Sequence, residues 1–102
     1  MIPESRVPTH PGEVLLEEFL KPLGIPQTAL AERLDIPVQR VNEIINEKRG
    51  VTPETAWLLA QAFGTTPEFW MSLQAQHDLA ECRPTRRVAR FAAPRRTSAR
   101  SR

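Results

Sequence analysis

The segment from residue 38 to residue 49 carries side chains suited to reading the edges of DNA bases. Its polar groups are amide, cationic and acidic, on Gln39, Arg40, Asn42, Glu43 and Asn46. Such amides can pair with adenine, a carboxylate can accept a hydrogen bond from cytosine N4, and an apolar side chain such as that of Val38 can pack on a thymine methyl. Lys48 and Arg49 follow in a polar loop, where contacts to backbone phosphates are expected. The segment therefore predicts a helix that lies in a major groove.

Two short helices with a tight turn between them should position these groups. Residues 27–34 and 38–46 each show apolar residues at helical spacing. The inward residues are Leu30, Ala31 and Leu34 in the first helix, and Val41, Ile44 and Ile45 in the second. Pro37 excludes the residue before it from α geometry and suits the start of the second helix. This is a helix-turn-helix pattern, although spacing alone also allows two packed helices of some other small bundle.

The rest of the chain predicts three more helices. His10-Pro11-Gly12-Glu13 opens the first, which Pro22 and Gly24 should end. Thr52-Pro53-Glu54 and Thr66-Pro67-Glu68 each combine a capping hydroxyl, a proline and an acid, which is a strong signal for a helix start. No alternating β-branched run indicates a strand. A chain of 102 residues can form one such domain, so the fold class is all-α with five helices.

Charge divides the chain into two parts. Residues 1–82 contain six Lys and Arg against all twelve acids, a net charge of −6, whereas residues 83–102 contain eight arginines and no acid. We predict a flexible N-terminal arm (1–9), a helix-turn-helix DNA-binding and dimerisation domain (10–81) and a disordered Arg-rich tail (82–102). The tail could contact phosphates or could be a silent, solvated extension. No apolar run is long enough to span a membrane, and the lone Cys82 fits a reducing cytoplasm.

Residues for catalysis are few. His10 precedes a helix-starting proline, His77 lies near the end of the last helix, and Cys82 follows it. Their spacing matches no zinc site, and no glycine-rich phosphate loop is present. We therefore predict no enzyme activity, no metal and no cofactor.

Residues 9–79 resemble the HigA family of antitoxins, which are Cro/cI-type (XRE) helix-turn-helix proteins. The specific motifs are HPGE (10–13), NEKR with a following glycine (46–50), TPETA (52–56) and PEFW with a following LQ (67–70 and 73–74). The resemblance implies a five-helix, lambda-repressor-like DNA-binding fold, commonly a homodimer through its last helix. It also implies binding to an inverted-repeat operator of the protein's own operon, in the cytoplasm and nucleoid, and neutralisation of a HigB toxin, a RelE-like mRNA endonuclease.

The resemblance assigns roles by position. Gln27 is expected to clamp a phosphate, Val38, Gln39 and Glu43 to contact bases with help from Arg40 and Asn42, and Asn46, Lys48 and Arg49 to contact the backbone. The expected dimer residues in the last helix are Phe69, Trp70 and Leu73. Two positions depart from the family pattern. Glu47 replaces a glycine, which removes an easy left-handed position from the loop and puts an acid that repels phosphate next to Asn46. Leu58 stands where a cation is common and should be exposed.

A toxin surface is expected on the first helix. RelE-type toxins are basic, and the acids Glu13, Glu17 and Glu18 lie outside the packed face of that helix. The simpler interpretation is that these glutamates only solubilise the helix. Two other functions remain open at this point. One is a stand-alone XRE-type regulator without a toxin, and the other is a protein–protein adaptor that has lost DNA binding.

Overall fold

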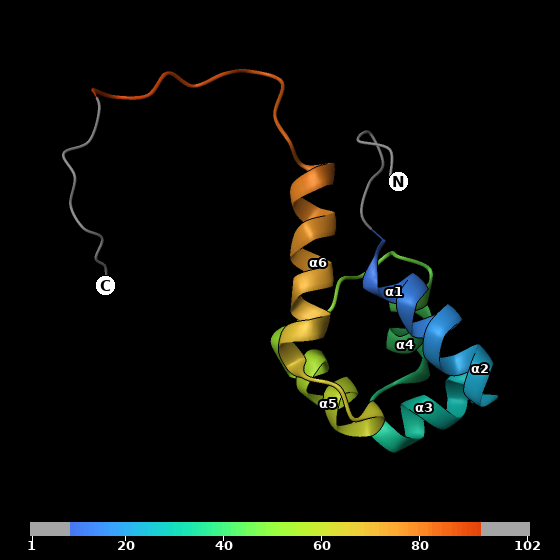
Figure 1. The fold of residues 1–102 in the computed structure, drawn as a ribbon. Coiled ribbons are helices and arrows are strands. Elements are labelled where there is room, and N and C mark those ends of the chain that lie inside the picture. Colours follow the sequence, from blue (N-terminus) through green and yellow to red (C-terminus); the bar gives the residue numbers. More distant parts are fainter. Residues whose placement is uncertain (1–8, 93–102) are drawn as a thin grey trace.

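The computed structural model describes residues 9–92, and within that range it contains helices and no strand. One long N-terminal helix, made of three consecutive segments, is followed by α3 to α6, so the prediction of an all-α fold with five helices is confirmed (Figure 1). The predicted arm and the end of the predicted tail, residues 1–8 and 93–102, lie outside the described residues. Residues 83–92 are exposed and form no helix or strand.

The first helix passes through its proline. Its segments are α1 (Pro11–Val14), a wider π-helical stretch η1 (Leu15–Leu20) and α2 (Lys21–Leu23). Pro22 lacks an N–H, and in a regular α-helix its ring would collide with the carbonyl group four residues earlier. The helix instead widens before the proline, and the Lys21 N–H bonds to the carbonyl of Leu16. The prediction that Pro22 ends the helix was therefore wrong, whereas Gly24 does end it, at φ 66°.

The other helix boundaries agree closely with the sequence predictions. The helices are α3 (Gln27–Leu34), α4 (Val38–Ile45), α5 (Pro53–Phe63) and α6 (Pro67–Glu81). Asn46 caps the end of α4 and is not inside it. The hydroxyls of Thr52 and Thr66 accept the backbone N–H of Thr55 and Phe69, which confirms both capping signals.

The helices enclose one apolar core. Its buried members are Leu15, Leu20, Leu30, Ala31, Leu34, Val41, Ile44, Ile45, Val51, Ala56, Leu59, Ala60 and Trp70. Trp70 is fully buried, its indole N–H donates to Thr65 Oγ1 at 2.8 Å, and Phe19 packs on its ring at 5.4 Å between centroids. A side chain buried in its own subunit offers no surface to another, so the prediction of Trp70 as a dimer residue is corrected. Leu58 is also only partly exposed, because it packs against the core.

Gly12 fixes the distance between the first helix and α4. A methyl group added at Gly12 would collide with the backbone carbonyl oxygen of Ile44 in α4. The obstacle is backbone and not the end of a flexible side chain, so it cannot move aside without shifting a helix. The glycine of the HPGE motif therefore sets the position of α4.

We expect Gly12→Ala to lower the free energy of unfolding by about 1–3 kcal/mol, as overpacking of a rigid contact does. The neighbouring exposed Glu13 provides a control, since Glu13→Ala removes no packed group. Urea denaturation of both variants tests the expectation. Equal stability of the two would show that the first helix can shift without cost.

Candidate nucleic-acid interface

Helices α3 and α4 form the predicted helix-turn-helix. Asp35 ends α3 in the left-handed region at φ 58°, and the Ile36 N–H bonds to the Ala31 carbonyl at 3.0 Å. Pro37 then caps the start of α4 in an extended conformation. Asp tolerates the left-handed region better than most residues, which lets the chain reverse within three residues. The turn therefore has a local cause in the sequence.

Helix α4 has one buried and one accessible face. Val41, Ile44 and Ile45 are buried, as predicted. The predicted contact residues Val38, Gln39, Asn42 and Asn46 are exposed, while Arg40 and Glu43 are half-buried. Lys48 and Arg49 in the following loop are also exposed, and Gln27 is half-buried at the start of α3.

Three of the predicted residues form a chain of amides. Asn42 Nδ2 donates to Gln27 Oε1 at 3.3 Å, and Asn46 Nδ2 donates to Asn42 Oδ1 at 3.1 Å. Because the Gln27 oxygen is already used as an acceptor, its NH₂ group is left to donate. The chain holds an N–H donor at the start of α3, where a phosphate contact was expected. Asn42, expected to assist base reading, thus also orients Gln27.

Glu43 is paired within the protein. Its Oε1 accepts from Arg49 Nε at 2.8 Å, and its Oε2 lies 3.5 Å from Gln39 Nε2. The sequence placed Glu43 and Arg49 in separate roles and gave no sign of this ion pair. About a third of the Glu43 side chain (30%) and half of the Arg49 side chain (48%) are accessible, so the pair is screened by solvent.

The loop after α4 is held by α6. Glu47 adopts φ 61° although it replaces the glycine of the family pattern, and the Lys48 N–H bonds to the Glu43 carbonyl at 2.8 Å. Farther on, Gln74 Oε1 accepts the Val51 N–H at 2.7 Å, in a buried position. The left-handed turn is therefore kept despite the substitution. Sequence reasoning missed the role of Gln74, although the LQ motif contains it.

His10 has a structural role. It is 5% exposed and caps the first helix, with its Nδ1 accepting the Gly12 N–H at 2.8 Å. Its ring meets that of His77 edge-on, at 4.8 Å between centroids. Burial lowers the pKa of His10 below its usual 6.5; the nearby carboxylates of Glu47 and Asp78 oppose this shift, and His77 adds to it. Within residues 9–92, no group of three or more His, Cys, Asp or Glu could hold a metal ion.

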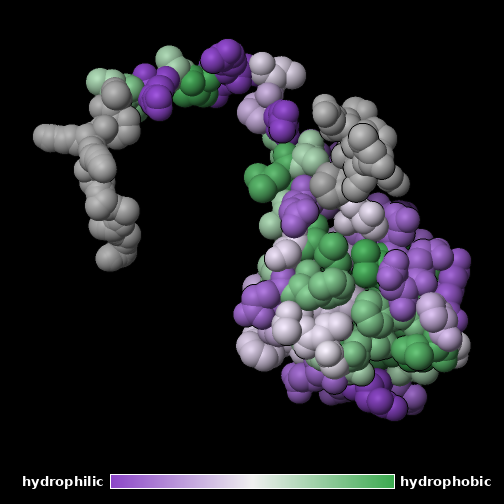
Figure 2. Space-filling model, viewed as in Figure 1, coloured by the Kyte–Doolittle hydropathy of each residue, from purple (hydrophilic) through white to green (hydrophobic). Residues whose placement is uncertain are grey.

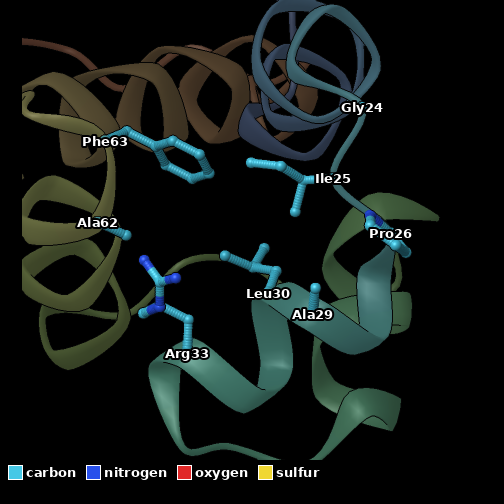
Figure 3. Close-up of a pocket in the computed structure, with 8 residues that line it drawn as sticks. All are labelled: Gly24, Ile25, Pro26, Ala29, Leu30, Arg33, Ala62 and Phe63. Atoms are coloured by element: carbon cyan, nitrogen blue, oxygen red, sulfur yellow. The ribbon is translucent and has the colours of Figure 1, made fainter.

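An apolar pocket lies where the turn after the first helix meets α3 and α5. Its lining residues are Gly24, Ile25, Pro26, Ala29, Leu30, Arg33, Ala62 and Phe63. In Figure 3 the Phe63 ring and the Ile25 side chain point towards each other across it, and Arg33 lies beside Ala62. None of the predicted DNA-contacting residues lines this pocket. Across residues 9–92, no helix combines the length and apolar character needed to cross a membrane.

Comparisons with known proteins identify the family. The helix-turn-helix family model matches residues 16–70. The chain is 44% identical over 80 residues to antitoxin HigA-1 of Vibrio cholerae, covering 78% of this chain and 74% of that protein. This chain belongs to the HigA antitoxin family of helix-turn-helix proteins. The fold agrees, because the structure titled "Pseudomonas aeruginosa antitoxin HigA with higBA promoter" is similar with a TM-score of 0.71 and 42% identity, over 72% of this chain and 80% of that one.

The chain is also similar to proteins that are not named antitoxins. The chain is 46% identical over 77 residues to YbaQ of Escherichia coli K12, covering 76% of this chain and 68% of that protein. YbaQ is named an uncharacterized HTH-type transcriptional regulator. Family membership therefore agrees with the resemblance seen in the sequence and leaves the toxin partner to be tested.

The capping histidine predicts a pH-dependent stability. Because the folded state lowers the His10 pKa, the unfolded chain binds the proton more tightly. The contribution of His10 to the free energy of unfolding is therefore complete above the usual pKa of 6.5 and decreases as the pH falls below it. His10→Asn keeps a capping acceptor without a titrating ring. We expect urea denaturation at about pH 7.5 and about pH 5.5 to show a smaller loss in the variant. An equal loss in both proteins would assign the dependence to other groups.

Proposed function

We propose that this chain is a DNA-binding antitoxin that represses its own operon. The observation that carries the proposal is the accessible face of α4, where exposed amides are linked by hydrogen bonds to Gln27 at the start of α3. The similar HigA structure with promoter DNA supports the same placement of these two helices. No catalytic step and no cofactor belong to this proposal.

In this proposal α4 lies in a major groove. Val38 and Gln39 lie in its first turn and face the bases, and the Gln27 NH₂ group donates to a phosphate. Asn46 and Lys48, beyond the end of α4, contact the backbone on the other side. The amide chain, which joins the two helices along this face, supports this orientation.

On binding DNA, the ion pair between Glu43 of α4 and Arg49 of the following loop would open, and each side chain would take a partner on the DNA. In the free protein the Glu43 carboxylate is bound to Arg49. On DNA, Glu43 accepts from cytosine N4 and Arg49 turns to a phosphate, so that both charges find new partners. An exposed ion pair is typically worth about 0–1 kcal/mol, so breaking it costs little. The pair keeps the acid neutralised until the correct base is met.

Two copies of the chain would bind an inverted repeat. Paired half-sites about one or more helical turns apart match the two-fold symmetry of a dimer. Among the predicted dimer residues, Phe69 is 39% exposed and Leu73 is partly buried, so these two remain in the proposed interface.

Trp57 on α5 is 58% exposed and was not singled out from the sequence. Its position off the buried face of α5 was already visible in the helical period.

We expect alanine at Gln39 or Glu43 to weaken operator binding by about 1–3 kcal/mol each. Because the lost contacts are contacts to bases, the affinity for non-specific DNA should fall less than the affinity for the operator. Glu43→Ala also frees Arg49 for phosphates, so non-specific affinity should rise slightly. Fluorescence anisotropy with operator and scrambled duplexes measures both.

Matched controls are Gln61→Ala and Glu54→Ala on α5, where both side chains are exposed. These variants should bind the operator as the unmodified protein does. Unchanged operator affinity in the Gln39→Ala, Glu43→Ala double variant would contradict the placement of α4 in the groove.

We further propose that the first helix binds a basic, RelE-like HigB toxin. Glu13, Glu17 and Glu18 are all exposed, as this requires. Glu17 pairs with Lys21 at 2.9 Å, which offsets part of its charge. Glu13 and Glu18 have no ion pair among residues 9–92, so they offer the stronger attraction to a basic partner.

We expect the Glu13→Lys, Glu18→Lys variant to associate with the toxin at least tenfold more slowly at low salt, since charges at an interface rim act mainly on the association rate. The control is Glu54→Lys, Glu68→Lys, which changes the net charge equally on α5 and α6. Stopped-flow mixing with the cognate toxin measures the rates. Equally slow association in both variants would indicate an effect of the net charge of the protein and not of a specific surface on the first helix.

A stand-alone regulator is the second candidate, favoured by the 46% identity to YbaQ. It predicts the same DNA binding without a toxin. A neighbouring reading frame for a small basic protein that forms a complex with this chain would decide for the antitoxin.

A further inference from the structure

The segment after α6 is a row of exposed cations. Residues 83–92 form no helix or strand, and all of them are exposed. They include Arg83, Arg86, Arg87 and Arg90, with Val88 and Phe91 as the large apolar residues. In Figure 2 this segment shows purple hydrophilic residues separated by green apolar ones beyond the end of the helical domain. An exposed, arginine-rich segment of this kind fits a polyanion.

These arginines do not use the acids of their own domain. Residues 1–82 have a net charge of −6, so partners are available. Nevertheless, none of the four described arginines forms a hydrogen bond or ion pair with another residue in the range 9–92. Their charge therefore remains available for an external partner.

The tail begins beside the predicted phosphate loop. One surface depression is lined both by Glu47, Lys48 and Arg49 after α4 and by His77, Asp78 and Glu81 at the end of α6. Arg83 follows Glu81 by two residues, and Figure 1 shows the chain leaving the domain at this end of α6. The arginines after α6 therefore begin close to Lys48 and Arg49, with the acids Glu47, Asp78 and Glu81 in the same depression.

We propose that the described segment 83–92 binds, through its four arginines, the phosphates of duplex DNA next to the half-site held by α4. This inference rests on the proposed DNA-binding function. An extended segment of ten residues spans at most about 33–36 Å. That length matches the rise of about one helical turn along the DNA axis. The acidic domain would supply the base contacts, and the tail would supply the attraction that does not depend on sequence.

Charge substitution in the full chain tests the proposal. One variant replaces Arg83, Arg86, Arg87 and Arg90 by Gln, and the matched control replaces the same four by Lys. Neither touches the folded core, because all four side chains are exposed outside the helices. Binding to an operator duplex with a turn of flanking DNA, and to a scrambled duplex of equal length, is measured by anisotropy from about 50 to 200 mM salt.

We expect the Gln variant to lose about 0.9 in the salt slope for each phosphate contact removed. With four contacts, its affinity falls about a hundredfold less over that salt range than that of the unmodified chain. The Lys control keeps the slope. The operator-to-scrambled ratio stays the same in all three proteins, because the tail does not read bases.

Three results would overturn the proposal. The slope could be unchanged in the Gln variant, or DNA affinity could rise, which would indicate a tail that shields the domain. The slope could also stay constant while binding to the purified toxin or to single-stranded RNA is lost, which would assign the tail to that partner. Failure of the operator function itself gives a different result, namely equal affinity for operator and scrambled DNA in every variant.

Discussion

The contact between the Gly12 backbone and the Ile44 carbonyl determines where α4 lies. At this point no side chain separates the first helix from α4. His10 holds the start of the first helix through its bond to the Gly12 N–H. Beyond the C-terminal end of α4, Gln74 of α6 accepts the Val51 N–H and so holds the loop that follows α4. The C-terminal end of α4 is therefore fixed from both sides, while Val38, Gln39 and Asn42 on its outer face stay exposed. Reading DNA requires this combination, because base contacts tolerate little displacement.

Four helix ends use the same turn, and the sequence treats them differently. At each one a residue in the left-handed region is followed by an N–H that bonds to the carbonyl five residues earlier; these residues are Gly24, Asp35, Glu47 and Gly64. Glycine adopts this conformation freely, whereas a residue with a side chain is strained there by about 1–2 kcal/mol. The two strained positions, Asp35 and Glu47, both flank α4. At Glu47 the turn is closed by its own N–H, which bonds to the Ile44 carbonyl, and by the Lys48 N–H, which bonds to the Glu43 carbonyl, so the turn is kept although Glu47 replaces the family's glycine.

Much of this arrangement could be predicted from the sequence, because it has local causes. Thr52, Thr66 and Pro37 mark helix starts by their own chemistry, and the apolar spacing in α3 and α4 selects the buried face. The misses concern long-range contacts. The helical period placed Trp70 on an apolar face but could not say whether its own core or a second subunit covers that face. Pro22 was expected to end a helix, since nothing local shows that the preceding turn widens. The bond between Glu43 and Arg49 joins a helix to a loop whose path depends on Glu47.

The acidic domain and the arginines that follow it would make different contributions to DNA binding. An acidic domain repels phosphates at long range, which disfavours binding at random sites. The ion pair of Glu43 with Arg49 removes part of that repulsion at the reading face itself and can open at small cost, because both side chains are partly solvated. What the domain lacks is attraction that is independent of sequence, and the arginines after Glu81 carry it on a segment outside the packed core. Because the base contacts come from the domain and the sequence-independent attraction comes from the arginines, the domain can stay acidic for a basic protein partner while the whole chain still associates with DNA. On the proposal that this chain also binds a basic toxin, a single basic domain would serve DNA alone, because its charge would repel the toxin.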